Sequence, residues 1–191
     1  MIGDPRVTEA LNEVLSNELT AINQYYLHYA MQKNWGYDKL AEHTYHESID
    51  EMKHADVLIH RLLFLEGHPN LQRLHPLRIG ETVKEQLEAD DLPDAVYVEG
   101  SLDGGGTGST VFIEDDVAAD ALTPESDRDL RRGIDICTET KDTVTRLLFE
   151  RILESEEEHV DYLETQLSLL AALGDQHYLA HHMRPPADPT G

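Results

Sequence analysis

Glu51-Met-Lys-His54 and Glu156-Glu-Glu-His159 are the two places in this chain where a Glu stands three residues before a His. Each motif lies in the middle of a long pattern of apolar residues with helical spacing. Positions i and i+3 share one face of an α-helix, so each motif presents a carboxylate and an imidazole together. Two such helices facing each other predict a site for two metal ions.

Apolar residues around the two motifs recur with the 3.6-residue period of amphipathic helices. The pattern predicts a first helix over residues 7–35, a second over residues 38–67 and a later one that ends at Gly174. Residues 176–183 predict a short further helix. Residues 68–79 contain two Pro and little periodicity, which indicates a long connection that crosses a bundle from end to end.

A change of composition interrupts another helix, which begins near Gly80. Over residues 91–116, two β-branched and aromatic runs flank a Gly-rich stretch, and this pattern predicts a β-hairpin-like insertion with a flexible tip. Helical spacing resumes after Thr123-Pro124, where Thr is a good N-cap and Pro suits a first turn. We therefore expect the third helix of a bundle to be split by the insertion.

The length and composition favour one domain over residues 1–191. With 191 residues, 40% of them hydrophobic, the chain is long enough to close a core of four or five helices. The predicted fold class is all-α: a four-helix bundle with a long crossover connection and a short fifth helix. Residues 184–191 are Pro-rich and predict a disordered tail.

The charge balance excludes several function classes. Fifteen Lys and Arg against 38 Asp and Glu give a formal net charge of −23, which disfavours nucleic acid and attracts cations. A single Cys, Cys137, forms no internal disulfide and suits a reducing compartment. The sequence has no signal-peptide pattern and no run of about 18 apolar residues, so we expect a cytoplasmic protein without a membrane span.

Ionisable residues occupy positions where the helical period calls for core side chains. Burying a carboxylate without a partner costs several kcal/mol, and no Lys or Arg falls on the same stripes. Bound cations are therefore the natural partners, and carboxylate with imidazole suits iron or manganese, and also zinc. The residues on these stripes are Glu18 in the first helix, Glu47, Glu51 and His54 in the second, and Glu156 and His159 in the last long helix.

Four strings closely resemble the bacterioferritin family, and the resemblance covers residues 1–90 and 117–180. It implies a ferritin-like bundle, a shell of 24 subunits, and a di-iron centre that oxidises Fe(II) with dioxygen or peroxide before the ferric product is stored as mineral. The strings are Asn17-Glu-Leu-Thr-Ala-Ile-Asn-Gln-Tyr-Tyr26, Tyr45-His-Glu-Ser-Ile-Asp-Glu-Met-Lys-His-Ala55, Leu63-Phe-Leu-Glu-Gly-His-Pro-Asn-Leu-Gln72 and Glu156-Glu-Glu-His-Val-Asp-Tyr-Leu-Glu-Thr-Gln-Leu167.

The resemblance also implies roles for individual metal ligands. Glu51 and Glu156 resemble the carboxylates that bridge the two irons. Glu18 resembles a terminal carboxylate, and His54 and His159 resemble the two imidazole ligands.

Four further residues resemble functional positions of the family. Tyr25 resembles the tyrosine placed to pass an electron, and His46 and Asp50 resemble inward-facing residues that hand electrons or iron to the shell cavity. Met52 points away from the metal face of its helix. It resembles the axial ligand of a haem b iron shared by two subunits at a twofold contact.

The match fails at one ligand. The family places a Glu on its third helix, where this chain carries the insertion. Asp120, in Asp116-Val-Ala-Ala-Asp120, is the first choice by local pattern, and Asp94 is the second by counting from the N-terminal side. Counting backward from the last long helix gives Thr123, which is not a carboxylate. Asp is one methylene shorter than Glu, so we expect the second iron to be held loosely.

Two functions follow as hypotheses. The first is an iron-storage ferroxidase that assembles as a homo-oligomeric 24-mer. The second is a haem-bearing structural shell subunit whose impaired di-iron site is complemented by an active paralogue in a hetero-oligomer. A rubrerythrin-like peroxidase is disfavoured because the chain has no Cys-x-x-Cys motif.

Overall fold

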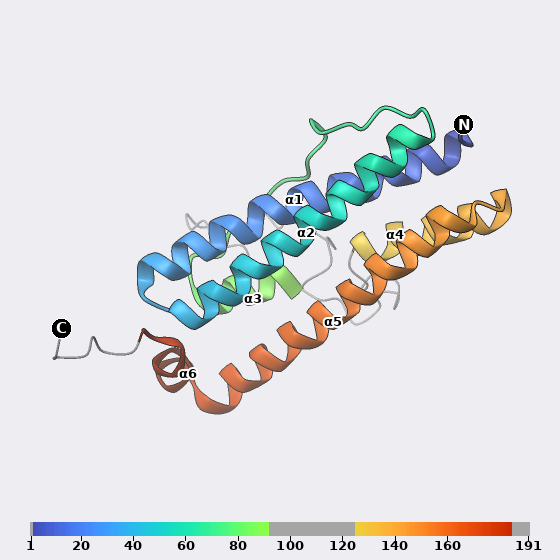
Figure 1. Ribbon diagram of the computed structural model, residues 1–191. Coiled ribbons are helices and arrows are strands. Elements are labelled where there is room, and N and C mark those ends of the chain that lie inside the picture. Colours follow the sequence, from blue (N-terminus) through green and yellow to red (C-terminus); the bar gives the residue numbers. More distant parts are fainter. Residues whose placement is uncertain (1, 92–124, 185–191) are drawn as a thin grey trace, which may run out of the picture.

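Two long helices run antiparallel along one side of the bundle, and a third long helix completes the frame (Figure 1). The structure is a computed structural model in which residues 2–91 and 125–184 are described. Its elements are α1 (Pro5–Trp35), α2 (Asp38–Phe64), α3 (Val83–Asp91), α4 (Glu125–Thr140), α5 (Thr143–Leu173) and α6 (Asp175–His182). The described residues are all-α, and the predicted fold class is confirmed.

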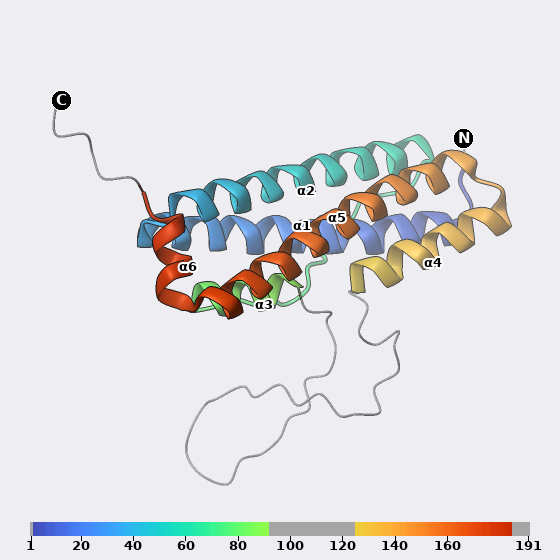
Figure 2. The ribbon, with the colours of Figure 1, turned by 90° about the horizontal axis from the view of Figure 1, so that it is seen from below.

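The fourth position of the bundle is shared by two short helices. Both α3 and α4 pack against α1 and α5, and they lie at different ends of the bundle (Figure 2). The interruption predicted between these two helices stays a prediction, because residues 92–124 are not described. The hairpin predicted for the insertion falls on residues 92–124, outside the described part, while Asp91, predicted as the start of the insertion, is the last residue of α3.

Local chemistry explains where the first helices begin and end. Asp4 caps α1 by accepting a 2.8 Å hydrogen bond from the Arg6 backbone N–H, and Pro5 fits the first turn because it needs no donor there. Gly36 ends α1 in the left-handed region with φ of 87°, which glycine adopts without a steric penalty. The short turn that results reverses the chain into α2.

The core consists of two apolar clusters with a polar layer between them. The larger cluster lies toward the chain's N-terminal end and includes Leu11, Leu58 and Phe149. The smaller cluster, at the opposite end, includes Leu40 and Leu163. Along α1, α2 and α5, the ionisable stripe residues come at the level between these clusters. The apolar ends therefore hold the bundle closed around its polar middle.

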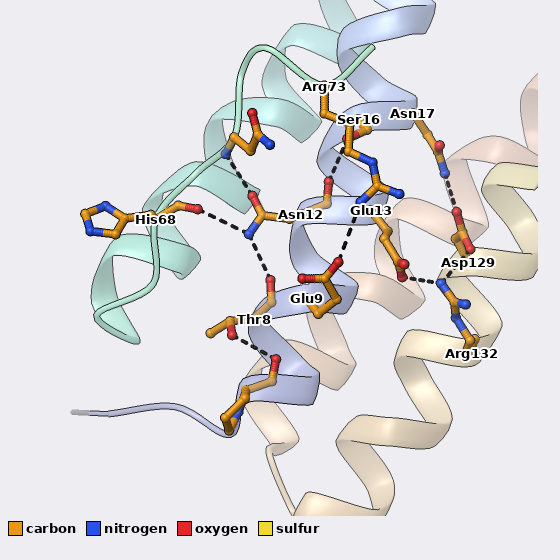
Figure 3. A network of polar contacts seen from close by, with 12 residues as sticks. Thr8, Glu9, Asn12, Glu13, Ser16, Asn17, His68, Arg73, Asp129 and Arg132 are labelled. Carbon is orange, nitrogen blue, oxygen red and sulfur yellow. Dashed lines mark hydrogen bonds and ion pairs between the residues drawn. The ribbon is translucent and has the colours of Figure 1, made fainter. Parts of the chain in front are cut away.

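The crossover connection is fastened to α1 by side-chain hydrogen bonds (Figure 3). The Asn12 amide donates to the His68 carbonyl at 3.2 Å and accepts from the Asn70 backbone N–H at 2.8 Å. Further along, Thr20 Oγ1 accepts from the His75 backbone N–H at 2.9 Å. These bonds hold the connection against the face of α1 as it passes the polar layer.

Polar contacts also attach the beginning of α4 to α1 (Figure 3). Asn17 Nδ2 donates to Asp129 Oδ2 at 3.1 Å, and Arg132 pairs with both Glu13 and Asp129. Because Asn17 precedes Glu18, these contacts bring the first turns of α4 beside the polar layer.

Two predictions about the ends of the chain have different outcomes. The short C-terminal helix is confirmed as α6. Arg184, predicted as part of a disordered tail, is anchored instead: its backbone N–H donates to Gly36 O at 2.9 Å and its guanidinium pairs with Asp38. Residues 185–191 lie outside the described part. None of the helices within residues 2–91 and 125–184 has both the length and the apolar character needed to span a membrane.

Candidate metal centre

Four ligand-bearing side chains from three helices converge in the polar layer. Glu18 comes from α1, Glu51 and His54 from α2, and Glu156 from α5, and each offers an atom within 4.8 Å of the others. We call these residues group one. His54 Nδ1 lies 3.0 Å from Glu51 Oε2, 3.4 Å from Glu18 Oε2 and 3.9 Å from Glu156 Oε1. One imidazole thus faces three carboxylates.

Burial makes group one electrostatically unfavourable without a further cation. Glu18 is 3% exposed and Glu51 is 4% exposed. Loss of hydration raises the pKa of Glu18 to about 8, and it raises the pKa values of Glu51 and Glu156 well above the ordinary Glu value. Negative neighbours raise these pKa values further: Glu18 raises the pKa of Glu51, and Glu51 raises the pKa of Glu156. The carboxylates therefore hold protons in the metal-free site more tightly than exposed carboxylates do.

A second set of ligand atoms lies where α2 and α5 meet. His43, Glu47 and His159 also bring their ligand atoms within 4.8 Å of one another, and we call them group two. His159 Nδ1 lies 2.9 Å from Glu47 Oε2, a contact outside hydrogen-bonding geometry, and His43 Nε2 lies 3.4 Å from Glu47 Oε1. Burial acts to raise the pKa of Glu47, but its contact with His159 and the nearby imidazoles outweigh burial and lower it.

A cavity of about 110 Å³ adjoins both groups. Its walls include Glu18, Glu51, Glu156 and His159, together with parts of the crossover connection and the neighbouring ends of α3 and α4. The Tyr25 ring lines it and lies 5.3 Å from the His159 ring, centre to centre. Burial and the surrounding carboxylates raise the pKa of Tyr25 well above its ordinary value, so its hydroxyl stays protonated.

Comparison with known proteins identifies the family. A model of the ferritin-like domain matches residues 8–92 and 122–173. The chain is 47% identical over 188 residues to a bacterioferritin of Mycolicibacterium paratuberculosis, with 98% of this chain and 100% of that protein covered. It is 44% identical over 178 residues to one of Brucella melitensis, with 93% and 92% covered. It is 43% identical over 185 residues to one of Rhodobacter capsulatus, with 97% of each covered. The chain belongs to the bacterioferritin family.

Five ligands expected from the bacterioferritin resemblance fall into two groups in the structure. Glu18, Glu51, His54 and Glu156 lie together in group one. His159 shares the cavity with three of them, but its Nδ1 is turned toward Glu47 in group two. The two Glu-x-x-His motifs of this chain therefore have different surroundings.

The other expected functional residues lie outside both groups. Met52 is 51% exposed on α2, as its position on the helix predicts, and haem ligation by it stays a prediction. His46 is also exposed, and Asp50 pairs with Lys53 at 2.5 Å. Asp120 and Asp94, the two candidates for the missing carboxylate, lie outside the described residues.

Three site residues were missed by the sequence reasoning. Glu47 lies on the apolar stripe, where its position alone predicts no role, and His43 lies one turn before it on α2. Asp127 on α4 is 6% exposed and lines the cavity. Its signal was its spacing, because it precedes Leu130 by three positions and extends the stripe of Leu130 and Cys137.

The donor set fits divalent metal ions. Oxygen and imidazole ligands from separate helices suit iron, manganese and zinc, and a bundle core is where ferritin-like proteins hold di-iron centres. Glu18 Oε2, Asp127 Oδ1 and His159 Nε2 are buried and have no hydrogen-bond partner within the described part of the chain. Bound cations would satisfy the atoms of Glu18 in group one and of His159 in group two.

Proposed function

We propose that this chain is a subunit of an iron-storage shell that oxidises Fe(II) in the polar layer between α1, α2 and α5. The observation that carries the proposal is group one: three buried carboxylates converge on a single imidazole. Burying several carboxylates is costly unless a positive charge compensates them. Fe(II) supplies that charge as the substrate, and this is why the site binds it.

The side chains position the substrate and set its charge environment. Glu51 and Glu156 come from different helices and would bridge two Fe(II) ions, while Glu18 and His54 hold one of them from the side of α1 and α2. Metal binding displaces the protons that the raised pKa values retain, so the site releases protons as it fills. Dioxygen or peroxide, as the two-electron oxidant, takes one electron from each of two Fe(II) ions.

Tyr25 would supply a further electron at the edge of the site. Its ring lies against His159, and its hydroxyl is held protonated by burial. A buried phenol beside the metal position would donate an electron and a proton together to an oxidant. His46 and Asp50, on the solvent side of α2, would pass iron or electrons between this site and the shell interior.

The remaining parts of the proposal concern assembly. We propose a cytoplasmic 24-subunit shell with ferric mineral inside, and a haem b bound between the Met52 side chains of two subunits. The exposure of Met52 supports this, since an exposed thioether could hold a haem iron in a subunit contact. The wild type and a Met52→Leu variant, both expressed with haem and then reduced, would be compared by absorption spectroscopy. A variant that retains the full amount of haem would contradict haem ligation by Met52.

A second candidate function is a structural, haem-bearing subunit that co-assembles with an active paralogue. One observation favours it: neither ligand group contains a residue of α3 or α4 within the described chain. The metal centre would then lack one carboxylate expected of the family.

Stopped-flow oxidation of Fe(II) by the assembled, purified protein distinguishes the two functions. The ferroxidase proposal expects a fast phase that saturates near two irons per subunit. A Glu18→Gln variant supplies the reference rate for shells with a damaged site. Intact wild-type shells that take up iron only through a slow phase at that rate would contradict the ferroxidase proposal and support the structural role.

A further inference from the structure

Group two is a cluster of metal-type ligands in which the family resemblance assigned only His159. Its residues come from two helices: His43 and Glu47 lie one turn apart on α2, and His159 lies on α5. Glu47 sits between the two imidazoles, with Oε2 toward His159 and Oε1 toward His43. Two ring nitrogens and a carboxylate oxygen thus converge within 4.8 Å.

Imidazole nitrogens of group two are buried and lack hydrogen bonds to the described residues. The His159 side chain is only 9% exposed, and neither of its ring nitrogens has a hydrogen bond to any described residue. His43 Nε2 is likewise buried without a hydrogen bond to the described chain. Buried polar nitrogens are normally satisfied, so these atoms point to a bound species that accepts them as ligands.

We propose that His43, Glu47 and His159 hold a divalent transition-metal ion, displaced from group one toward the beginning of α2. The inference rests on the proposed function in one respect, because His159 was expected to ligate the second iron. Here that histidine faces Glu47, so the second metal position has two imidazoles and one carboxylate in place of a carboxylate-rich set. Zinc accepts such a set with water at the fourth position, and the nitrogen donors favour later divalent metals.

Another His and acidic residue on α2 have the same spacing as His43 and Glu47 but lack a third ligand in the described part of the chain. His60 and Asp56 are also an i,i+4 pair on α2, with His60 Nε2 3.6 Å from Asp56 Oδ1. Both side chains are mostly exposed, and neither belongs to a ligand group within the described residues. The difference is the buried third ligand from α5, which makes His60 a matched control for His43.

The test is a Zn(II) titration of the full-length, metal-free protein, counted as equivalents per chain. The wild type is expected to bind two equivalents. The His43 ring lies against the Tyr162 ring, with 3.6 Å between their centres. His43→Phe keeps an aromatic ring at this position but removes both ring nitrogens. It should weaken one equivalent by more than about tenfold, since even outer partners of metal ligands contribute about 10- to 100-fold to affinity.

Three further variants make the outcome decisive. Glu47→Gln should weaken the same equivalent as His43→Phe, and it decides the matter if His43→Phe does not fold. His60→Phe should leave both equivalents unchanged. Glu18→Gln should weaken only the other equivalent, and if it changes nothing, the proposed iron site at group one fails while the group-two proposal stands. Two equivalents of unchanged affinity in both His43→Phe and Glu47→Gln would overturn the group-two proposal.

Zinc anomalous diffraction from wild-type crystals adds a positional readout. The expected peak lies among His43, Glu47 and His159. The proposed site would be overturned if no zinc peak lay at His43 and a peak lay instead between Glu51 and Glu156, with His159 turned toward it.

Discussion

The two Glu-x-x-His motifs have the same spacing but different partners. In α2, His54 Nδ1 contacts Glu51 of its own motif at 3.0 Å and Glu18 of α1 at 3.4 Å. In α5, His159 Nδ1 contacts Glu47 of α2 at 2.9 Å. In the first motif the His lies beside the Glu of its own motif, whereas in the second the His lies beside Glu47 of another helix.

The bundle around each motif accounts for this difference. The first motif faces α1, which is continuous for 31 residues and presents Glu18 at the level of the site. The second motif faces the fourth position of the bundle, where α3 ends at Asp91 and α4 begins at Glu125. A sequence motif therefore fixes which ligand atoms a helix offers, while the neighbouring helix decides how they are used.

The largest effect is expected from removing the first motif. Glu51→Leu with His54→Leu should abolish the fast phase of Fe(II) oxidation, because one bridging carboxylate and one imidazole are lost. The metal-free bundle should be as stable as the wild type or more stable by about 1–4 kcal/mol, as is common when apolar residues replace buried ionic groups. Denaturant unfolding and stopped-flow absorbance measure the two quantities, and iron oxidation at the wild-type rate would contradict the role of group one.

A pH titration of metal-free stability should separate the groups, since their carboxylate pKa values shift in opposite directions. For Glu18, the folded-state pKa of about 8 exceeds the unfolded value near 4.5, so its contribution is fully present below pH 4.5 and is lost as pH rises toward 8. The free energy of unfolding changes by at most about 1.4 kcal/mol per pH unit for each proton that the folded site retains. For Glu47, the lowered pKa gives stability above pH 4.5 that is lost as pH falls through the folded value.

Single amide variants check this assignment. Glu18→Gln should flatten the loss of stability between pH 4.5 and 8, and Glu47→Gln should flatten the loss at lower pH. Unfolding curves at fixed ionic strength measure both, and a metal-free wild type whose stability rises from pH 5 to pH 8 would contradict the raised pKa of Glu18.

The smallest effect is expected at Asp127, the buried carboxylate that α4 contributes to the cavity wall. Burial raises its pKa, and its charge adds to the negative potential at Glu156. Asp127→Asn should weaken Fe(II) binding by less than about tenfold, because it removes a neighbouring charge and no member of either ligand group. Equilibrium binding of Fe(II) without oxygen is the measurement, and complete loss of one iron would make Asp127 a direct ligand.

Much of this fold could be predicted from the sequence because its signals are local. The apolar stripes and the ends of the helices follow from neighbouring residues: α1 ends at Trp35 as predicted, and α2 ends at Phe64, three residues before the predicted end. The convergence of Glu18, Glu51, His54 and Glu156 was also within reach, because each breaks an apolar stripe at a matching level.

The second half of the site was not predictable in the same way. Which carboxylate faces His159 depends on how α5 lies against α2. That arrangement is not a property of residues close to His159 in the chain. Glu47 and His43 gave only the signal of an i,i+4 pair, which His60 and Asp56 give equally well at the surface.

Crystals soaked with Fe(II) and measured at the iron absorption edge would show directly whether group one binds iron. We expect an anomalous peak inside the bundle, bound by Glu18, Glu51, His54 and Glu156, and lost in the Glu51→Leu, His54→Leu variant. Iron found only at the outer surface or in the shell interior, with these four side chains unchanged and unliganded, would contradict it.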